Sequence, residues 1–130
     1  MAENITAEEM KTLLKSQQGE LDAVLMYNAL AETVKDEKDA ETFRQLAKEE
    51  AHHASVFKAL SEKTLQPKRT KAILLPILYR ILGKKILYPF IARGEYNAVK
   101  TYEPVAARFP EVESVRNDEQ RHGDIVKALL

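Results

Sequence analysis

Residues 19–31 read "GELDAVLMYNALA", and residues 94–106 read "GEYNAVKTYEPVA". Aligned at a shift of 75 residues, these stretches share Gly, Glu, Ala, Val, Tyr and Ala. A second pair matches at a shift of 69 residues: "EEAHHASVFKAL" begins at Glu49, and "DEQRHGDIVKAL" begins at Asp118. The chain therefore contains the same two-part unit twice, which indicates a duplicated helical hairpin.

The fold class follows from this repeat and from the composition. Ala, Leu, Glu, Lys and Gln dominate, and no alternation of apolar and polar residues is sustained, so we predict an all-α fold. Two hairpins joined by a long connection predict a four-helix bundle. We expect one domain, 1–130, with hairpin one at about 6–63, a crossover containing a short extra helix at about 64–83, and hairpin two at about 84–130.

Several helix ends are readable in the sequence. Thr6-Ala7-Glu8-Glu9 has the form of a capping box. Asp36 is suited to cap the second helix. A break is expected near Gly83, followed by a third long helix that runs to about Ala107.

The bulk numbers exclude several classes of protein. The net charge is zero, which argues against a general nucleic-acid binder. There is no Cys, so disulfides, thiolate metal sites and Cys nucleophiles are excluded. The start, "MAENITAEEM", is polar and acidic, unlike a signal peptide. We expect a cytoplasmic protein.

The crossover is apolar and basic. Between Lys63 and Gly94 there are eight basic residues and no acidic ones, so the remainder carries twelve basic and twenty acidic residues. Central charges argue against a membrane span. Three readings stay open: packing on the bundle or in a homodimer interface, which we favour; contact of residues 71–93 with an anionic membrane surface; or docking of an acidic electron donor.

Glutamates interrupt the apolar stripe of each long helix. Within each hairpin, the two glutamates are equally far from the turn, so they lie at matching heights on antiparallel helices. In the last helix of each hairpin, a His follows the Glu by three residues and shares its face. The residues concerned are Glu20, Glu50, His53, Glu95, Glu119 and His122.

Four inward carboxylates are costly without a counter-charge. Two divalent cations would balance them, with both imidazoles neutral. A Glu from each of two helices, with Glu-x-x-His from each of the other two, is the pattern of di-metal carboxylate bundles. Oxygen-rich ligation suits iron or manganese, and zinc stays open.

The stretch "EEAHHA" offers a competing pair, Glu49 and His52. The second copy has Asp118 and Arg121 at the matching positions. An arginine cannot replace a metal ligand, so we expect His52 on the outer face.

These motifs resemble the erythrin domain of rubrerythrins, in the ferritin-like superfamily. "GELDAVLMYNALAE", "AKEEAHHASVF", "GEYNAVKTYEPVA" and "NDEQRHGDIV" carry the resemblance, which covers about residues 9–130. Rubrerythrins are non-haem di-iron proteins that reduce hydrogen peroxide. The resemblance implies two iron ions held by the six residues named above. It also implies that Glu50 and Glu119 bridge the two irons, and that His53 and His122 each bind one iron.

Two departures from the family bear on the reaction. Full rubrerythrins carry a Cys-ligated domain that delivers electrons, and this sequence has no Cys, so an external electron donor protein is expected. Rubrerythrins place an extra glutamate where this chain has Ala98. The redox-dependent exchange of an iron ligand is therefore not carried over.

Other roles stay open at the level of sequence. Tyr27 and Tyr102 each follow a ligand glutamate by seven residues; they are either core tyrosines or groups that hydrogen-bond the ligands and supply an electron or proton. The leading function is a di-iron peroxidase or oxidase. The alternatives are a ferritin-like quinone-ring hydroxylase, a non-catalytic iron-binding protein and a purely structural bundle.

Overall fold

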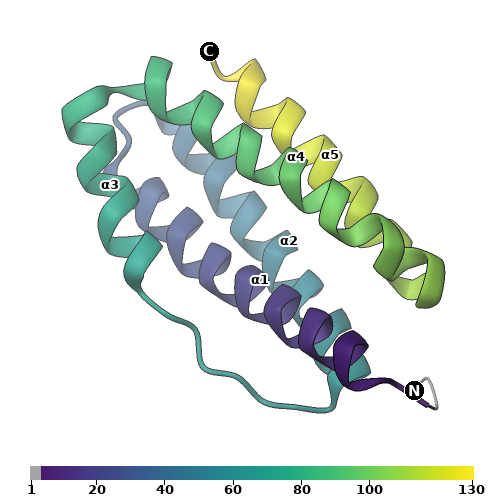
Figure 1. Ribbon diagram of the computed structural model, residues 1–130. Helices are drawn as coiled ribbons and strands as arrows, with labels where there is room; N and C mark the ends of the chain where they lie inside the picture. The colour runs from purple at the N-terminus through teal and green to yellow at the C-terminus, as the bar shows by residue number, and fades with distance from the viewer. Residues whose placement is uncertain (1–3) are drawn as a thin grey trace. The chain divides into compact units, whose positions relative to one another are not determined.

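A computed structural model describes residues 4–130 of the chain (Figure 1). All of its regular secondary structure in that range is helical, which confirms the predicted all-α class. The elements are α1 (Ala7–Thr33), α2 (Glu37–Ser61), α3 (Thr70–Leu82), α4 (Lys84–Arg108), the 3-10 turn η1 (Pro110–Val112) and α5 (Glu113–Ala128). They divide into two compact units, and the division falls within α3, between Ile77 and Leu78.

In the first unit, α1 packs against α2 as a hairpin (Figure 1). The predicted capping box begins α1: Glu9 N donates to Thr6 Oγ1 at 3.1 Å, and Thr6 N donates to Glu9 Oε1 at 2.9 Å. Asp36 caps α2 as predicted, since its carboxylate accepts from the backbone N–H groups of Lys38 and Asp39. Both ends satisfy backbone donors that would otherwise lack helical partners.

An apolar core runs along this hairpin. Tyr27 and Phe43 are completely buried and stack with their ring centroids 5.8 Å apart. Leu13, Leu30 and Phe57 are also completely buried. The period of these residues along α1 and α2 explains why the glutamates on the same stripe are buried with them.

The segment after α2 is fastened along α1. Gln17 Nε2 donates to the carbonyl of Lys63, and Gln18 Nε2 to that of Gln66, both at 2.9 Å. Further along, Lys68 N donates to Asp22 Oδ1 at 2.7 Å. These bonds set where α3 begins. Asp22 thus holds the segment between α2 and α3 against α1.

Gly83 separates α3 from α4, at the break that the sequence predicted. Its φ of 77° lies in the left-handed region, where glycine is favoured because it has no Cβ. In the second unit, α4 packs against α5, with η1 between them in the chain. Lys84 Nζ donates to the carbonyl of Leu129 at 3.0 Å and so ties the start of α4 to the end of α5.

The second hairpin contains a close contact between α4 and α5 at Gly123. A Cβ added there would lie 2.4 Å from Cε1 of Tyr96. The Tyr96 hydroxyl donates to Asp124 Oδ1 at 2.6 Å, and this hydrogen bond raises the pKa of Tyr96 to about 12. At the corresponding positions of the repeat, the first hairpin has Leu21 and Ala54. A larger residue on one helix is thus matched by a smaller one on its neighbour.

The effect of Gly123→Ala on the free energy of unfolding should depend on the residue at position 96. Alanine in a helix interior is worth about 1 kcal/mol over glycine, but overpacking typically costs about 1–3 kcal/mol. We expect Gly123→Ala to lower the free energy of unfolding by about 1 kcal/mol in the native chain. In a Tyr96→Leu background it should raise that free energy, because the ring is gone. Urea unfolding of the four variants checks this, and equal stabilisation by alanine in both backgrounds would contradict it.

Candidate metal centre

The first hairpin buries two carboxylates beside one imidazole. Glu20 comes from α1, and Glu50 and His53 come from α2; each is at most 2% exposed. His53 Nδ1 lies 3.0 Å from Glu50 Oε1 and 3.4 Å from Glu20 Oε2. Glu50 and His53 reach the same point because they are three residues apart on one helix, and Glu20 meets them from the neighbouring helix. These three residues are the first triad.

The second hairpin repeats this arrangement. Glu95 comes from α4, and Glu119 and His122 come from α5; the exposed fractions are 7%, 3% and 0%. His122 Nδ1 lies 3.3 Å from Glu95 Oε2 and 3.6 Å from Glu119 Oε1. These three residues are the second triad. In both hairpins, Nδ1 of the histidine faces one glutamate on the neighbouring helix and one glutamate three residues earlier on its own helix.

The spacing within each triad suits one metal ion. The ligand atoms of each triad all lie within 4.8 Å of one another. Two ligand atoms bonded to one ion at about 2.1 Å lie about 3.0 Å apart at a right angle and about 3.4 Å apart at a tetrahedral angle. The four distances from the histidine nitrogens, 3.0–3.6 Å, are close to these values. The residues present therefore fit a bound cation.

The charges of the triad residues also favour a bound cation. Burial of carboxylates is costly unless hydrogen bonds or opposite charges compensate for the lost water. A neutral imidazole carries only one N–H group. If that proton is on Nδ1 of His53 or His122, two carboxylates must share one donor. A divalent ion in either triad would accept both carboxylates and the ring nitrogen together, with a net charge near zero. Each triad has the donor set of an oxygen-rich site for iron or manganese.

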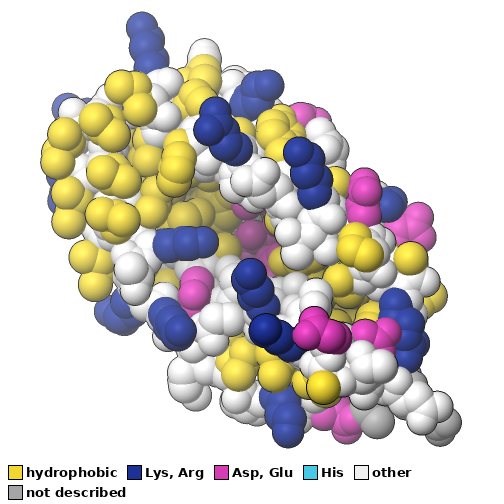
Figure 2. All heavy atoms as spheres, viewed as in Figure 1, with side chains coloured by type: hydrophobic (Ala, Val, Ile, Leu, Met, Phe, Trp, Pro, Cys, Tyr) yellow, Lys and Arg dark blue, Asp and Glu magenta, His cyan; other side chains and the backbone are white. Residues whose placement is uncertain are grey.

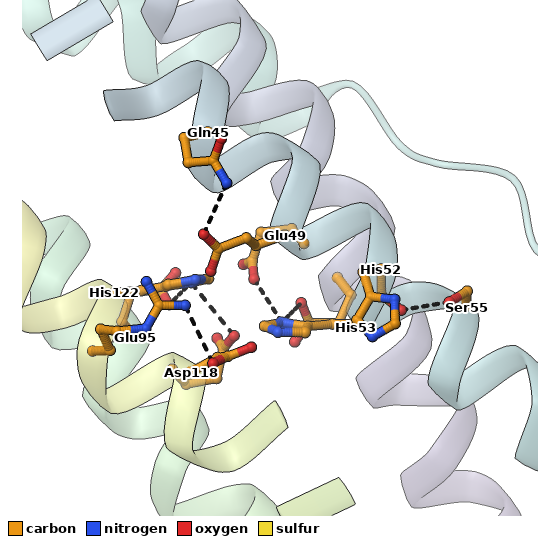
Figure 3. A network of polar contacts seen from close by, with 12 residues as sticks. Gln45, Glu49, His52, His53, Ser55, Glu95, Asp118 and His122 are labelled. Carbon is orange, nitrogen blue, oxygen red and sulfur yellow. Dashed lines mark hydrogen bonds and ion pairs between the residues drawn. The ribbon is translucent and has the colours of Figure 1, made fainter. Parts of the chain in front are cut away.

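The competing pair in "EEAHHA" lies elsewhere. His52 is exposed, as expected, and its ring is turned away from that of His53 (Figure 3). Glu49 is half-buried and accepts from Gln45 Nε2 at 3.1 Å. In the second hairpin, the matching Asp118 forms an ion pair with Arg121 at 3.2 Å. Of the two overlapping Glu-x-x-His pairs, only Glu50 and His53 lie on the buried face of α2.

Tyr27 and Tyr102 both lie in the buried part of their hairpins, at 0% and 5% exposure. Tyr27 stacks on Phe43, which is the contact of a core tyrosine. Their predicted part in the chemistry stays a prediction.

Sequence reasoning missed two contacts near the triads, one polar and one steric. Gln17 precedes Glu20 on the same stripe of α1 and is buried, accepting from Ser61 Oγ at 2.6 Å while it donates to Lys63. The signal was present, since Gln17 interrupts the apolar stripe as Glu20 does. The contact of Tyr96 with Gly123 was also missed. The coupled change from Leu21 and Ala54 between the two repeats would have revealed it.

A family model described as Rubrerythrin matches residues 11–130. The chain belongs to the rubrerythrin family. The match spans both hairpins and all six triad residues, and it confirms the family that the four sequence motifs indicated. Comparison with curated proteins and with solved structures gave no match. For a rubrerythrin, two buried Glu-Glu-His triads are compatible with a di-iron site.

His53→Ala should weaken metal binding, and His52→Ala should not. The substitution at position 53 removes a buried ring nitrogen that faces two carboxylates, whereas position 52 is exposed. We expect His53→Ala to weaken ferrous-ion binding by at least the roughly 10–100-fold that loss of a partner hydrogen-bonded to a metal ligand costs. Anaerobic titration followed by elemental analysis measures this. Equal affinities for the two variants would contradict the assignment of the first triad.

Proposed function

We propose that this rubrerythrin is a non-haem di-iron oxidoreductase, which reduces hydrogen peroxide or oxygen with electrons from an external donor. The observation that carries the proposal is the occurrence of two equivalent buried triads, one in each hairpin of a rubrerythrin-family chain. A purely structural role does not explain why six polar side chains are buried at matching positions, because their burial is costly. Manganese or zinc in place of iron is distinguished by elemental analysis of the purified protein.

In this proposal the two triads serve one centre. The ligand count supports it: four carboxylates and two imidazoles balance two divalent cations. Within each hairpin the glutamates lie at equal distances from the turn, so each pair sits at one level. A Glu from each of two helices, with Glu-x-x-His from each of the others, is how bundles hold two metal ions. Glu50 and Glu119 are the proposed bridging ligands.

Each ligand has a distinct task. The carboxylates would hold the ions and offset their charge, and a carboxylate can bind through one or both oxygens. His53 and His122 would fix one position on each ion, because their rings are buried and their Nδ1 atoms lie 3.0 Å and 3.3 Å from a glutamate oxygen. Bound ferrous iron would supply the electrons that cleave the O–O bond of the oxidant.

Tyr27 and Tyr102 are the proposed sources of a proton or an electron. Each follows a ligand glutamate by two helical turns on the same face and is buried. Reduction of one hydrogen peroxide to two water molecules consumes two electrons and two protons. The apolar surroundings of the tyrosines, such as Phe43 beside Tyr27, would limit access of water to this route.

The electron donor is proposed to lie outside residues 1–130. The chain has no Cys with which to bind an iron–sulfur or rubredoxin-type centre. Ala98 stands where an extra ligand glutamate would be needed for exchange of an iron ligand. The proposal therefore assigns the reaction to a fixed set of six ligands.

The identity of the oxidant can be tested directly. Stopped-flow absorption of the di-ferrous protein, mixed with hydrogen peroxide or with oxygen at equal concentrations, should show faster oxidation by peroxide. Glu119→Ala, which removes a proposed bridge, should lose this rapid phase. His52→Ala serves as the control, because the residue is exposed and outside the triads. Equal or faster oxidation by oxygen would overturn the peroxidase assignment in favour of an oxidase.

A further inference from the structure

Exposed apolar side chains are concentrated in one segment of the chain. Of the eight large hydrophobic side chains that are exposed in residues 4–130, seven lie between Ile73 and Phe90. The most exposed are Ile81 at 71%, Ile73 at 62% and Phe90 at 61%. Figure 2 shows hydrophobic side chains gathered over α3 with Lys and Arg side chains nearby. Contiguous exposure of this kind marks an interaction surface.

Helix α3 is apolar on two faces, of which one is covered. Leu75 and Pro76 are buried. Ile73, Ile77 and Ile81 follow one another at four-residue steps, so they share another face, and all three are exposed. In residues 4–130, the side chains of the second face remain exposed to solvent.

The first turns of α4 carry the same combination of residues. Ile86 and Phe90 are four residues apart and exposed at 58% and 61%, and Lys85 and Arg93 are exposed near them in the sequence. On α3, Arg80 is exposed beside Ile81. No acidic residue occurs between Lys63 and Gly94. The segment thus joins exposed apolar side chains to a purely basic charge.

We propose that the exposed face of α3 and the first turns of α4 bind an anionic phospholipid surface. Isoleucine, leucine and phenylalanine side chains would enter the boundary between headgroups and acyl chains, to a depth of about 5–10 Å. The arginines and lysines would pair with lipid phosphates, since each basic residue near such a surface contributes about a fivefold gain in affinity. This proposal does not depend on the metal centre.

Charge favours lipid over a second copy of the chain. A two-fold dimer places the same surface against itself, which would bring the basic side chains of two copies, Arg80, Lys85 and Arg93, into one interface. An anionic surface attracts these side chains instead. Outside residues 63–94 the chain has twelve basic and twenty acidic residues, so the remainder would be repelled. Attraction and repulsion together select this segment for contact.

The contact would be on the surface of the membrane. No helix in residues 4–130 is both long enough and apolar enough to cross a bilayer. Helix α3 has thirteen residues, about 20 Å at 1.5 Å per residue, shorter than the roughly 30 Å hydrocarbon core. It is suited to lie along the interface.

Vesicle sedimentation tests the proposal. The full chain should pellet with vesicles of phosphatidylcholine and phosphatidylglycerol but not with phosphatidylcholine alone, and added salt should release it. Ile81→Ser with Phe90→Ser should abolish pelleting, while Leu130→Ser, at another exposed apolar residue, should not. Lys85→Gln with Arg93→Gln should weaken binding by roughly twenty-fivefold. The charge-matched control, Lys38→Gln with Lys48→Gln, changes exposed lysines outside the segment.

Light scattering and circular dichroism complete the test. Unchanged helical signal in the variants would show that lost pelleting reflects the surface and not unfolding. Failure of the native chain to bind anionic vesicles would overturn the proposal. So would a dimer in solution that Ile81→Ser with Phe90→Ser converts to monomer while lipid binding is absent, because the apolar face would then be an interface between copies.

Discussion

Burial of paired carboxylates beside a single imidazole is the constraint on which this structure depends. Each hairpin places two glutamates and one histidine where water is excluded, and the attraction of a cation can offset that cost. The rest of the hairpin holds these groups in place. The caps at Thr6 and Asp36 fix where α1 and α2 begin, and the core around Tyr27 and Phe43 fixes which stripe faces inward.

The two hairpins keep this chemistry constant while the packing around it varies. His53 and His122 face their carboxylates through the same ring nitrogen, at 3.0–3.6 Å. One residue after each histidine, the first hairpin has Ala54 and the second has Gly123, whose missing Cβ leaves room for Tyr96. Ligand positions are thus maintained by the repeat, and neighbouring positions adjust in pairs.

Much of this could be predicted from sequence because it depends on local spacing. A helix brings residues three or four apart together, so Glu50 and His53 could be assigned to one face, and the repeat added their counterparts. The course of the segment after α2 could not be predicted, because it depends on side chains distant in sequence, such as Gln17 with Lys63. The exposed face of α3 could not be predicted either, because apolar residues such as Ile77 occur on every side of this helix.

The central proposal is that the two triads hold two metal ions in one centre. The most direct test is electron paramagnetic resonance, combined with the iron content of the same sample. The protein is purified anaerobically, loaded with iron and then oxidised. Two irons per chain with no signal from the fully oxidised state are expected, because bridging carboxylates couple the two ferric spins. Two irons per chain with the signal of isolated high-spin ferric ions would contradict the shared centre, and absence of bound metal would contradict the whole account.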